Sequence, residues 1–364
     1  MRPEYRPVNG GSKTERIYFS NMPSALVEAS WKRFREHNKT KQIFSVNPNI
    51  EVYTVNEHVF SLYHPNCDGG GDVWMYLIVG KEKAFLIDTA YGLGDISALC
   101  SELSGGKELI VANTHLGPDH VYGNFRFDHV FCHEYEVDNI AWKLRIPDCF
   151  GYLFNADGSC KWLQFDRNDL PKQVPVSTVY LRDLEEGNIP EHEGVLMIGV
   201  PNHYTWKLDE DMEIEMIWTG GHMPGHAMFL DKKDRILFAG DDICQDTIGI
   251  SGPKPFLHNN KYRNVYTYRE NLKELVERLE EIDYVFSGHF LGSIEKEVLP
   301  ATLDTLNYIL ENPEGYDYKE FYHTGSGDVV EKMYKRVRGY GDVAYEWDSI
   351  YPTGMEEGTI KENG

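Results

Sequence analysis

The sequence predicts an α/β fold in which two β-sheets pack face to face and helices cover their outer faces, an αββα sandwich. The main observation is a repeated order: a β-rich block, a helix and a short apolar strand occur in the first half of the chain and again in the second. Packed layers of sheets and helices accommodate this order, because each element then buries its apolar face. The composition agrees, because 364 residues with 41% hydrophobic and 26% charged side chains are typical of a globular protein with a sizeable core.

The first half begins with an N-terminal arm, residues 1–45, in which the spacing of apolar residues over 24–37 predicts a short amphipathic helix. From residue 50 onward the residue pattern is typical of β-strands, with a glycine-rich turn at 69–71. A helix over 95–103 then leads into a fully apolar strand, which is typical of burial on both faces. The predicted strands of this half are 50–55, 59–63, 74–79, 84–88 and 109–112.

The second half repeats this order with strands at 213–218, 227–230 and 236–239, a helix over 264–282 and a strand at 284–287. Between the halves the pattern is irregular, with proline and glycine among aromatic residues, and it predicts an insertion at about 136–205 in a domain that spans 46–300. Residues 301–364 are predicted to form a C-terminal helical extension. Its helices are expected at 299–310 and 328–338.

The charge of the chain restricts its partners. There are 36 Lys and Arg against 58 Asp and Glu, a net charge of −22, which repels nucleic acid and anionic membrane surfaces and leaves a small-molecule substrate as the expected partner. No stretch approaches the length of an apolar membrane span, and the N-terminal residues do not resemble a signal peptide. The 6 cysteines form no C-x-x-C pair, which favours reduced thiols and a cytoplasmic location. A second copy of the chain is a further expected partner, bound through the arm.

Histidine and aspartate gather where the predicted strands end. The strand at 109–112 runs into Thr-His-Leu-Gly-Pro-Asp-His, 213–218 is followed by Gly-Gly-His-Met-Pro-Gly-His, and two later strands end in Gly-Asp and Gly-His. Side chains on such loops converge at the edge of a sheet, and imidazole and carboxylate are good ligands for zinc or iron. The sequence therefore predicts a metal site. The residues that gather in this way are His115, Asp119, His120, His222, His226, Asp241 and His289.

In that order and spacing, these blocks resemble the metallo-β-lactamase superfamily of metal-dependent hydrolases, over about residues 52–299. That family carries Thr-His-x-His-x-Asp-His, Pro-Gly-His-Thr-x-Gly-His, Gly-Asp and Gly-His, preceded by a hairpin. The matching segments here are 114–120, 221–226, 240–241 and 288–289, with the hairpin at 76–78 and 85–89. The resemblance implies two mixed sheets and one or two bound metal ions, Zn²⁺ first, with iron or manganese as alternatives.

The resemblance also implies roles for these residues. Asp119 would bind metal and also orient a water molecule or accept its proton, and it is the predicted catalytic residue. Asp88 would lie outside the ligand set, and His226 is expected to form hydrogen bonds instead of binding the ion. The implied ligands fall into two groups that share one carboxylate: His115, His222 and Asp241, and Asp119, His120, His289 and Asp241.

The sequence departs from the family at Gly117, which stands where the family has its second histidine. Because glycine has no side chain to offer, the first group keeps only two imidazoles and the shared carboxylate. Three outcomes stay open: a weakened first site completed by water, a site completed by a remote ligand, or a single ion held by the second group. The candidates for a remote ligand are His64, His133 and His258.

The ligand set predicts a hydrolase that uses metal-activated water on a small ester, thioester or lactone. The aromatic insertion and residues 256–263 are expected to lie over the site, with His258, Tyr262 and Arg263 as substrate contacts. One alternative is a di-iron redox protein of the same fold, but those relatives carry glutamate at the position of Gly117 and usually need an attached flavodoxin-like domain, for which residues 300–364 are expected to be too few. A weakly catalytic, ligand-binding relative is the other alternative. The negative charge argues against cleavage of RNA.

Overall fold

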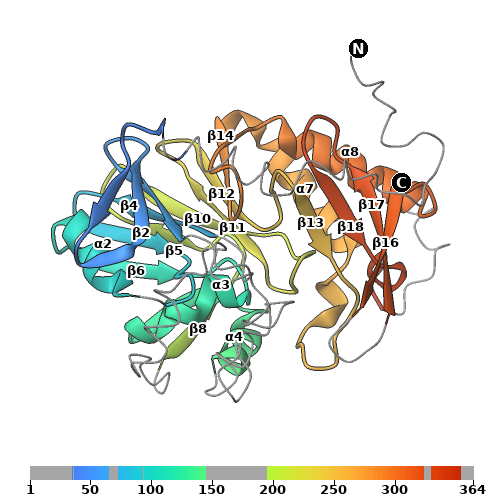
Figure 1. Cartoon of the computed structure of the whole chain (residues 1–364), viewed down its shortest axis with the longest axis horizontal. Helices are drawn as coiled ribbons and strands as arrows, with labels where there is room; N and C mark the ends of the chain where they lie inside the picture. Colours follow the sequence, from blue (N-terminus) through green and yellow to red (C-terminus); the bar gives the residue numbers. More distant parts are fainter. Residues whose placement is uncertain are drawn as a thin grey trace, which may run out of the picture.

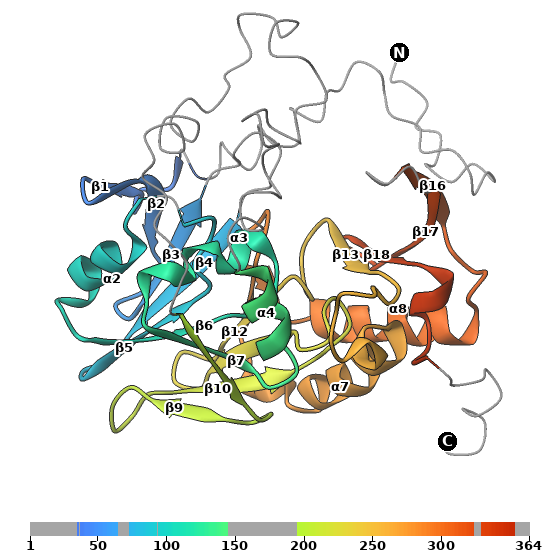
Figure 2. The same cartoon turned by 90° about the horizontal axis from the view of Figure 1, so that it is seen from below.

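The computed structural model describes residues 35, 37–64, 73–92, 94–144, 195–323 and 329–353. The predicted arm helix at 24–37 lies almost wholly outside these residues, as do residues 145–194 of the predicted insertion. In the described part of the chain the strands form three sheets, which follow one another from the N-terminal to the C-terminal half (Figures 1 and 2). None of the helices described there has both the length and the hydropathy that crossing a membrane requires.

The first sheet holds eight strands that lie side by side in chain order. The pairs from β1 to β5 are antiparallel, whereas β5 to β8 run parallel, so the sheet is mixed. The carboxyl ends of the parallel strands consequently lie at one edge. The strands are β1 (Gln42–Phe44), β2 (Asn47–Thr54), β3 (Val59–His64), β4 (Val73–Val79), β5 (Lys83–Ile87), β6 (Glu108–Ala112), β7 (His129–His133) and β8 (Leu196–Val200).

The second sheet has the strand order β15-β14-β12-β11-β10-β9. Only β12 and β14 pair in parallel, and the connection between them contains helix α7 (Val265–Glu277). Asp241 and His289, which follow these two strands, therefore emerge at the same edge of the sheet. The strands are β9 (Thr205–Lys207), β10 (Glu213–Trp218), β11 (Ala227–Asp231), β12 (Ile236–Gly240), β14 (Tyr284–Ser287) and β15 (Ile294–Glu295).

The two sheets are buried on both faces. In β4, Val73 and Met75 pack with α2 (Ile96–Ser104), whereas Trp74 and Tyr76 point into the core between the sheets. The far face of the second sheet packs against α7 and the C-terminal elements. The layers are thus helix, sheet, sheet and helix, and the predicted αββα sandwich is confirmed.

The helix ends follow local sequence signals. Asp95 caps α2 by accepting a hydrogen bond of 2.9 Å from a backbone N–H three residues on, and Gly105 ends the helix in the left-handed conformation at φ 68°. Asn264 caps α7 in the same way, at 2.8 Å. The predicted helix 264–282 is too long, because α7 ends at Glu277 and a 3₁₀ turn follows. The short helical segments are α3 (Pro118–Val121), η1 (Tyr122–Arg126), η2 (Asn260–Tyr262), η3 (Leu279–Glu281) and η4 (Trp347–Ser349).

The C-terminal region corrects one prediction. The helix expected at 299–310 is present as α8 (Val298–Glu311), but the helix expected at 328–338 is wrong, because this segment forms strand β17 (Val329–Arg336). In β17 only Met333 is buried, so the side-chain pattern is weak, and pairing with strands on both sides decides the conformation. β17 belongs to a third sheet, of order β13-β18-β17-β16, that lies beside α8 (Figure 1). Its other strands are β13 (Thr247–Ile250), β16 (Tyr318–His323) and β18 (Asp342–Tyr345).

The region predicted to be irregular, 136–205, is regular at both of its described ends. Helix α4 (Val137–Lys143) opens it, and β8 pairs with β7 as part of the first sheet before the chain enters β9. These elements have five to seven residues at most, too few for a clear periodic pattern, which explains why the sequence did not indicate them.

Asp231, at the end of β11, is expected to make stability depend on pH. Its Oδ1 accepts backbone hydrogen bonds from Lys233 and Asp234, but its Oδ2 is buried without a hydrogen-bond partner among the described residues, and burial raises the pKa of this carboxyl to about 6. The folded state therefore holds the proton more tightly than the unfolded state, in which the pKa is about 4. The stability that this group contributes is present at lower pH and is lost as the pH rises through 6.

Replacing Asp231 with asparagine removes this loss. As the pH rises from about 4.5 to about 7.5, we expect the free energy of unfolding of the parent to fall by about 2 kcal/mol relative to that of the variant. Urea unfolding at the two pH values measures the change. Parallel pH profiles for parent and variant would contradict the assignment.

Candidate metal centre

Four loops at one edge of the sandwich carry the predicted ligands. The loop after β6 holds His115 and continues into α3, whose first turn presents Asp119 and His120. The loop after β10 holds His222, and two further loops follow β12 and β14. The glycines in these loops allow the backbone to turn sharply, as at Gly221, where φ is 78°. The strand ends bring together side chains that are far apart in the sequence.

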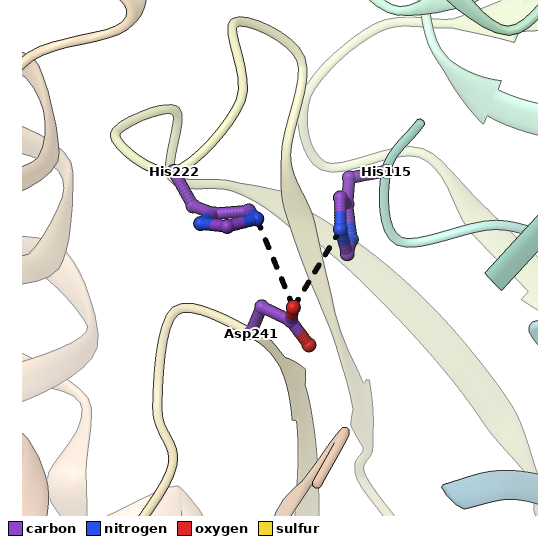
Figure 3. A group of neighbouring side chains, drawn as sticks. All are labelled: His115, His222 and Asp241. Atoms are coloured by element: carbon purple, nitrogen blue, oxygen red, sulfur yellow. Dashed lines mark ion pairs between the residues drawn. The ribbon is translucent and has the colours of Figure 1, made fainter. Parts of the chain in front are cut away.

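The first group consists of His115, His222 and Asp241, which converge in Figure 3. The Nε2 atoms of His115 and His222 each lie 3.7 Å from Oδ2 of Asp241. His115 is buried, whereas His222 and Asp241 are partly accessible to solvent. The ligand atoms of all three lie within 4.8 Å of one another, which is the spacing of side chains around a shared cation.

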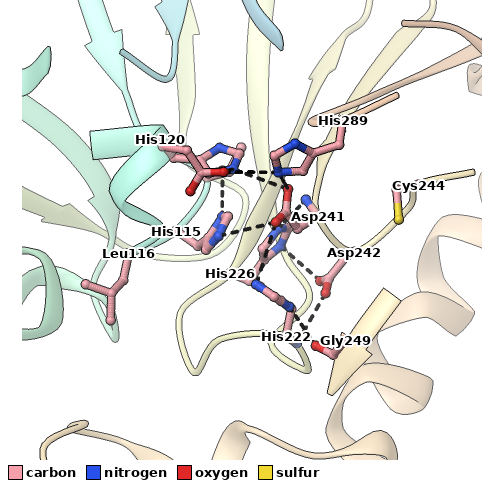
Figure 4. A network of polar contacts seen from close by, with 12 residues as sticks. His115, Leu116, His120, His222, His226, Asp241, Asp242, Cys244, Gly249 and His289 are labelled. Atoms are coloured by element: carbon pink, nitrogen blue, oxygen red, sulfur yellow. Dashed lines mark hydrogen bonds and ion pairs between the residues drawn. The ribbon is translucent and has the colours of Figure 1, made fainter. Parts of the chain in front are cut away.

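The second group consists of Asp119, His120 and His289. Figure 4 shows His120 and His289 beside Asp241, where this group meets the first. His289 Nε2 lies 3.3 Å from Asp119 Oδ2 and 3.3 Å from Asp241 Oδ1. His120 Nε2 lies 3.3 Å from the same Asp241 oxygen and 3.6 Å from Asp119 Oδ2. Asp241 thus offers Oδ2 to one group and Oδ1 to the other.

Two atoms of the centre indicate that it fits a cation. His120 Nε2 and Asp241 Oδ1 are both buried and lie 3.3 Å apart, but neither forms a hydrogen bond of good geometry with the described residues. Buried polar atoms without a hydrogen bond are few in folded proteins, and a bound ion is one of the explanations for them. Imidazole nitrogens and carboxylate oxygens, the donors present here, are the usual ligands of zinc and iron.

The charges of the centre also favour a cation. Burial and the neighbouring His120 hold the pKa of His115 well below its usual range, so that its imidazole is neutral and able to bind an ion. Burial also disfavours the charged form of His289, but the carboxylates of Asp241 and Asp119 outweigh burial and raise the pKa of His289 well above its usual range. Two acidic side chains therefore attract positive charge to this point, and a bound ion would displace the proton from the imidazole.

The imidazoles are held in place by hydrogen bonds on their far sides. Asp88 Oδ2 accepts a hydrogen bond of 2.8 Å from His120 Nδ1, and Asp88 also binds the backbone N–H of Thr114 at 2.8 Å. His222 Nδ1 donates to the carbonyl of Gly249 at 2.6 Å. Partners of this kind fix the ring orientation and leave Nε2 facing the centre. The structure thus places Asp88 behind the predicted ligands.

His226 is fully buried and lies among hydrogen-bond partners. Its Nδ1 lies 2.9 Å from Asp242 Oδ2, and its Nε2 accepts a hydrogen bond of 3.1 Å from the backbone N–H of Asp241. Both ring nitrogens are therefore engaged, which is the arrangement expected from the sequence. His226 supports the loop that carries Asp241.

Gly117 lies against the ligands themselves. A Cβ atom at this position would be 2.7 Å from His120 Cδ2, 2.8 Å from His115 Nε2 and 2.9 Å from Asp119 Oδ1. All three distances are shorter than real Cβ contacts. The φ of Gly117 is −50°, which any residue can adopt, so the requirement for glycine comes from space and not from backbone conformation. The loop as folded has no room for a side chain at this position.

The three candidate remote ligands lie elsewhere. His64 packs its ring on Tyr91 at the end of β3, and His133 stacks on Trp218 with ring centroids 5.3 Å apart. His258 is exposed in the loop before η2. Among the described residues, neither group of metal-binding side chains includes any of these histidines.

The three predicted substrate contacts differ in their burial and in the residues that they touch. Arg263 is buried and donates from Nε to the carbonyl of His222 at 3.0 Å and from Nη1 to the carbonyl of Gly252 at 2.8 Å, so it supports the His222 loop. Tyr262 stacks on Tyr135, with ring centroids 4.6 Å apart, and remains partly exposed. His258 bonds through its backbone N–H to Asn139, at 2.7 Å.

One further residue, Glu136, touches two of the ligand loops and was not indicated by the sequence. Its carboxylate accepts hydrogen bonds from backbone N–H groups 20 and 89 residues away along the chain. A lone glutamate beside a short helix carries no motif, and its backbone partners leave no trace in the sequence. Only the folded structure reveals these contacts.

Comparison with solved structures finds metallo-β-lactamases and their relatives. DIM-1 metallo-β-lactamase matches with 16% identity, 71% of this chain and 98% of that chain covered, and a TM-score of 0.44. A metallo-β-lactamase from Pontibacter korlensis matches with 15% identity, 71% and 99% coverage and a TM-score of 0.45. A metallo-β-lactamase family protein from Thermus thermophilus matches with 19% identity, 71% and 82% coverage and a TM-score of 0.44.

No curated protein matches the chain. The family model of the metallo-β-lactamase superfamily matches residues 68–289, which is more than half of the chain and includes every predicted ligand. Members of that superfamily are mostly metal-dependent hydrolases. With its sandwich fold and its clustered histidines and aspartates, the chain belongs to the metallo-β-lactamase superfamily.

Proposed function

We propose that the protein is a metal-dependent hydrolase that cleaves a small ester, thioester or lactone. The observation that carries the proposal is the convergence of two groups of histidine and aspartate side chains from four loops of the described chain. Two of their buried atoms, His120 Nε2 and Asp241 Oδ1, lie 3.3 Å apart without forming a hydrogen bond of good geometry. We infer that Asp119, His120, His289 and Asp241 hold one ion tightly. His115 and His222 would hold a second, weaker one with Asp241, because Gly117 contributes no ligand.

The chemistry follows from this set of residues. A bound ion would supply a water molecule that ionises near neutral pH and a Lewis acid for the substrate carbonyl. Burial alone would raise the pKa of Asp119, but His120 and His289 outweigh burial and lower it, so the carboxylate is ionised at neutral pH and can accept a proton. Asp88 and Gly249 would keep the imidazoles of His120 and His222 oriented during the reaction.

A carbonyl substrate of modest size agrees with the surroundings of the centre. Tyr135, in the loop after β7, Trp218, at the end of β10, and Tyr262, in η2, form an aromatic cluster with centroid distances of 4.6 to 5.2 Å. Aromatic side chains with a few polar groups are typical of sites for small organic ligands. The net charge of −22 disfavours polyanionic substrates such as RNA.

Hydrolysis of a panel of aryl esters, acyl thioesters and lactones by zinc-loaded protein tests the proposal. We expect His289→Ala to lower kcat/KM by about a hundredfold or more, since it removes one donor from the tighter group. His129→Ala, which changes an exposed histidine on β7, serves as the matched control and should keep full activity.

Three results would contradict the proposal. They are a panel left intact by the zinc-loaded parent, equal rates for His289→Ala and the parent, and purified protein with about two iron ions per chain and a visible absorption band, which would favour a di-iron redox protein.

A further inference from the structure

We infer that Glu136 is a positioning residue that sets the spacing between His115 and His222 and thereby enables these two imidazoles to hold a metal ion together. The inference rests on the proposed metal-dependent function and concerns the weaker of its two ion sites. Within the described part of the chain, the Glu136 carboxylate forms hydrogen bonds with two backbone N–H groups and one amide side chain. It acts through the backbone of the loops that carry the ligands.

One carboxylate joins the two loops. Glu136 Oε1 accepts a hydrogen bond of 3.0 Å from the backbone N–H of Leu116, the residue after His115. Glu136 Oε2 accepts a hydrogen bond of 2.9 Å from the backbone N–H of Gly225, three residues after His222. The separation of the two loops is therefore limited to the width of a single carboxylate group.

Burial of the Glu136 carboxylate is unfavourable in free energy, because it removes a charged group from water. The side chain is 0% exposed, and burial raises the pKa of its carboxyl above the usual value. No lysine or arginine forms an ion pair with it in the described part of the chain, and besides the two backbone groups its partner is the amide of Asn139, at 3.1 Å. A buried charge that is satisfied mainly by N–H groups of two separate loops fixes those loops at close range.

The neighbouring residues are shaped around this link. A Cβ atom at Gly225 would lie 2.6 Å from Glu136 Cβ and 2.6 Å from its backbone nitrogen, so only glycine allows the loop to approach so closely. Asn139 orients the carboxylate and accepts a hydrogen bond of 2.7 Å from the backbone N–H of His258. The same network thus extends to the loop before η2.

Gly117 explains why such a link matters in this chain. With no side chain at that position, the first group has one imidazole from each of two loops and the shared Asp241. Two ligands on separate loops bind an ion well only if the loops are held at the right separation, because the entropic cost of bringing them together otherwise weakens binding. Glu136 provides that constraint.

Titration of metal-free protein with Co²⁺, followed by its visible absorption, tests the inference. We expect the parent to take up two equivalents, a tight one and a weaker one. In Glu136→Gln an amide N–H₂ would face a backbone N–H, so we expect the weaker equivalent to lose about tenfold or more in affinity while the tight one changes by less than about threefold. Gly225→Ala should produce the same selective loss.

Asp231→Asn is the matched control, because it also converts a buried carboxylate that accepts two backbone N–H groups, but in a hairpin turn outside the centre. It should leave both equivalents unchanged. Should Glu136→Gln fail to fold, Asn139→Ala carries the same test, since it leaves the carboxylate and removes the amide that orients it.

Three results would overturn the inference: uptake of a single equivalent by the parent, unchanged binding in the folded variants, or equal weakening of both equivalents. Because Co²⁺ binding is measured and not turnover, a protein that hydrolyses no substrate of the panel still provides the test.

Discussion

Asp241→Asn is expected to abolish hydrolysis and to weaken the binding of both metal ions. The Asp241 carboxylate lies between the two groups, with one oxygen 3.3 Å from Nε2 of both His120 and His289 and the other 3.7 Å from Nε2 of both His115 and His222. An amide is neutral and offers one weak acceptor oxygen, so the variant loses the ligand that both ions share. We expect the variant to lose several kcal/mol of transition-state stabilisation, which corresponds to a decrease in rate of about a thousandfold.

Metal analysis after dialysis and hydrolysis of the best ester of the panel measure this effect. Asp283→Asn is the matched control, because Asp283 is an exposed carboxylate that pairs with Arg235 at the surface. Its metal content and rate should equal those of the parent. An Asp241→Asn variant that retains two ions and normal turnover would show that the two groups do not share a ligand.

Substitution of Gly117 is expected to weaken metal binding even when a histidine is introduced. Restoring the family's second histidine would complete the first group in number of ligands. A Cβ atom here, however, would lie within 2.9 Å of His115 Nε2, His120 Cδ2 and Asp119 Oδ1. These side chains cannot move away freely, because His120 is held by Asp88 at 2.8 Å. We therefore expect Gly117→Ala and Gly117→His each to lower the affinity for the weaker ion by about tenfold or more.

Gly292→Ala is the control for this substitution, since the nearest atoms to a Cβ there would be ring carbons of Trp74, at 3.6 Å, an ordinary contact. Calorimetric titration of metal-free protein with Zn²⁺ compares the three variants with the parent. Tighter binding of a second zinc ion by Gly117→His would mean that the loop can rearrange and that the first group is simply incomplete in the parent.

Much of the fold and the whole set of candidate ligands could be predicted from the sequence. The reason is that every ligand lies in a segment that follows a strand, from one residue after β12 for Asp241 to eight residues after β6 for His120, and the order of strands places these ends at one edge. The resemblance to the family indicated, in addition, how the ligands divide into two groups. The residues themselves showed only that histidine and aspartate recur at strand ends.

The parts that could not be predicted depend on long-range contacts. The sequence predicts a helix where strand β17 forms, because its pairing partners, β16 and β18, decide its conformation and only Met333 marks a buried face. The sequence predicts Arg263 as a substrate contact, and it carries no sign of the hydrogen bond that the Arg263 guanidinium donates to the carbonyl of His222. Glu136 was missed because its partners are backbone groups in distant loops, which no pattern of residue types records.

The central claim is that side chains from four loops surround a metal ion. Anomalous X-ray scattering at the zinc absorption edge, measured from crystals of the zinc-loaded protein, tests it most directly. The account predicts a strong peak between Asp119, His120, His289 and Asp241, and a weaker one beside His115 and His222. Crystals without an anomalous peak among these residues, or with zinc bound only at other places on the surface, would contradict it.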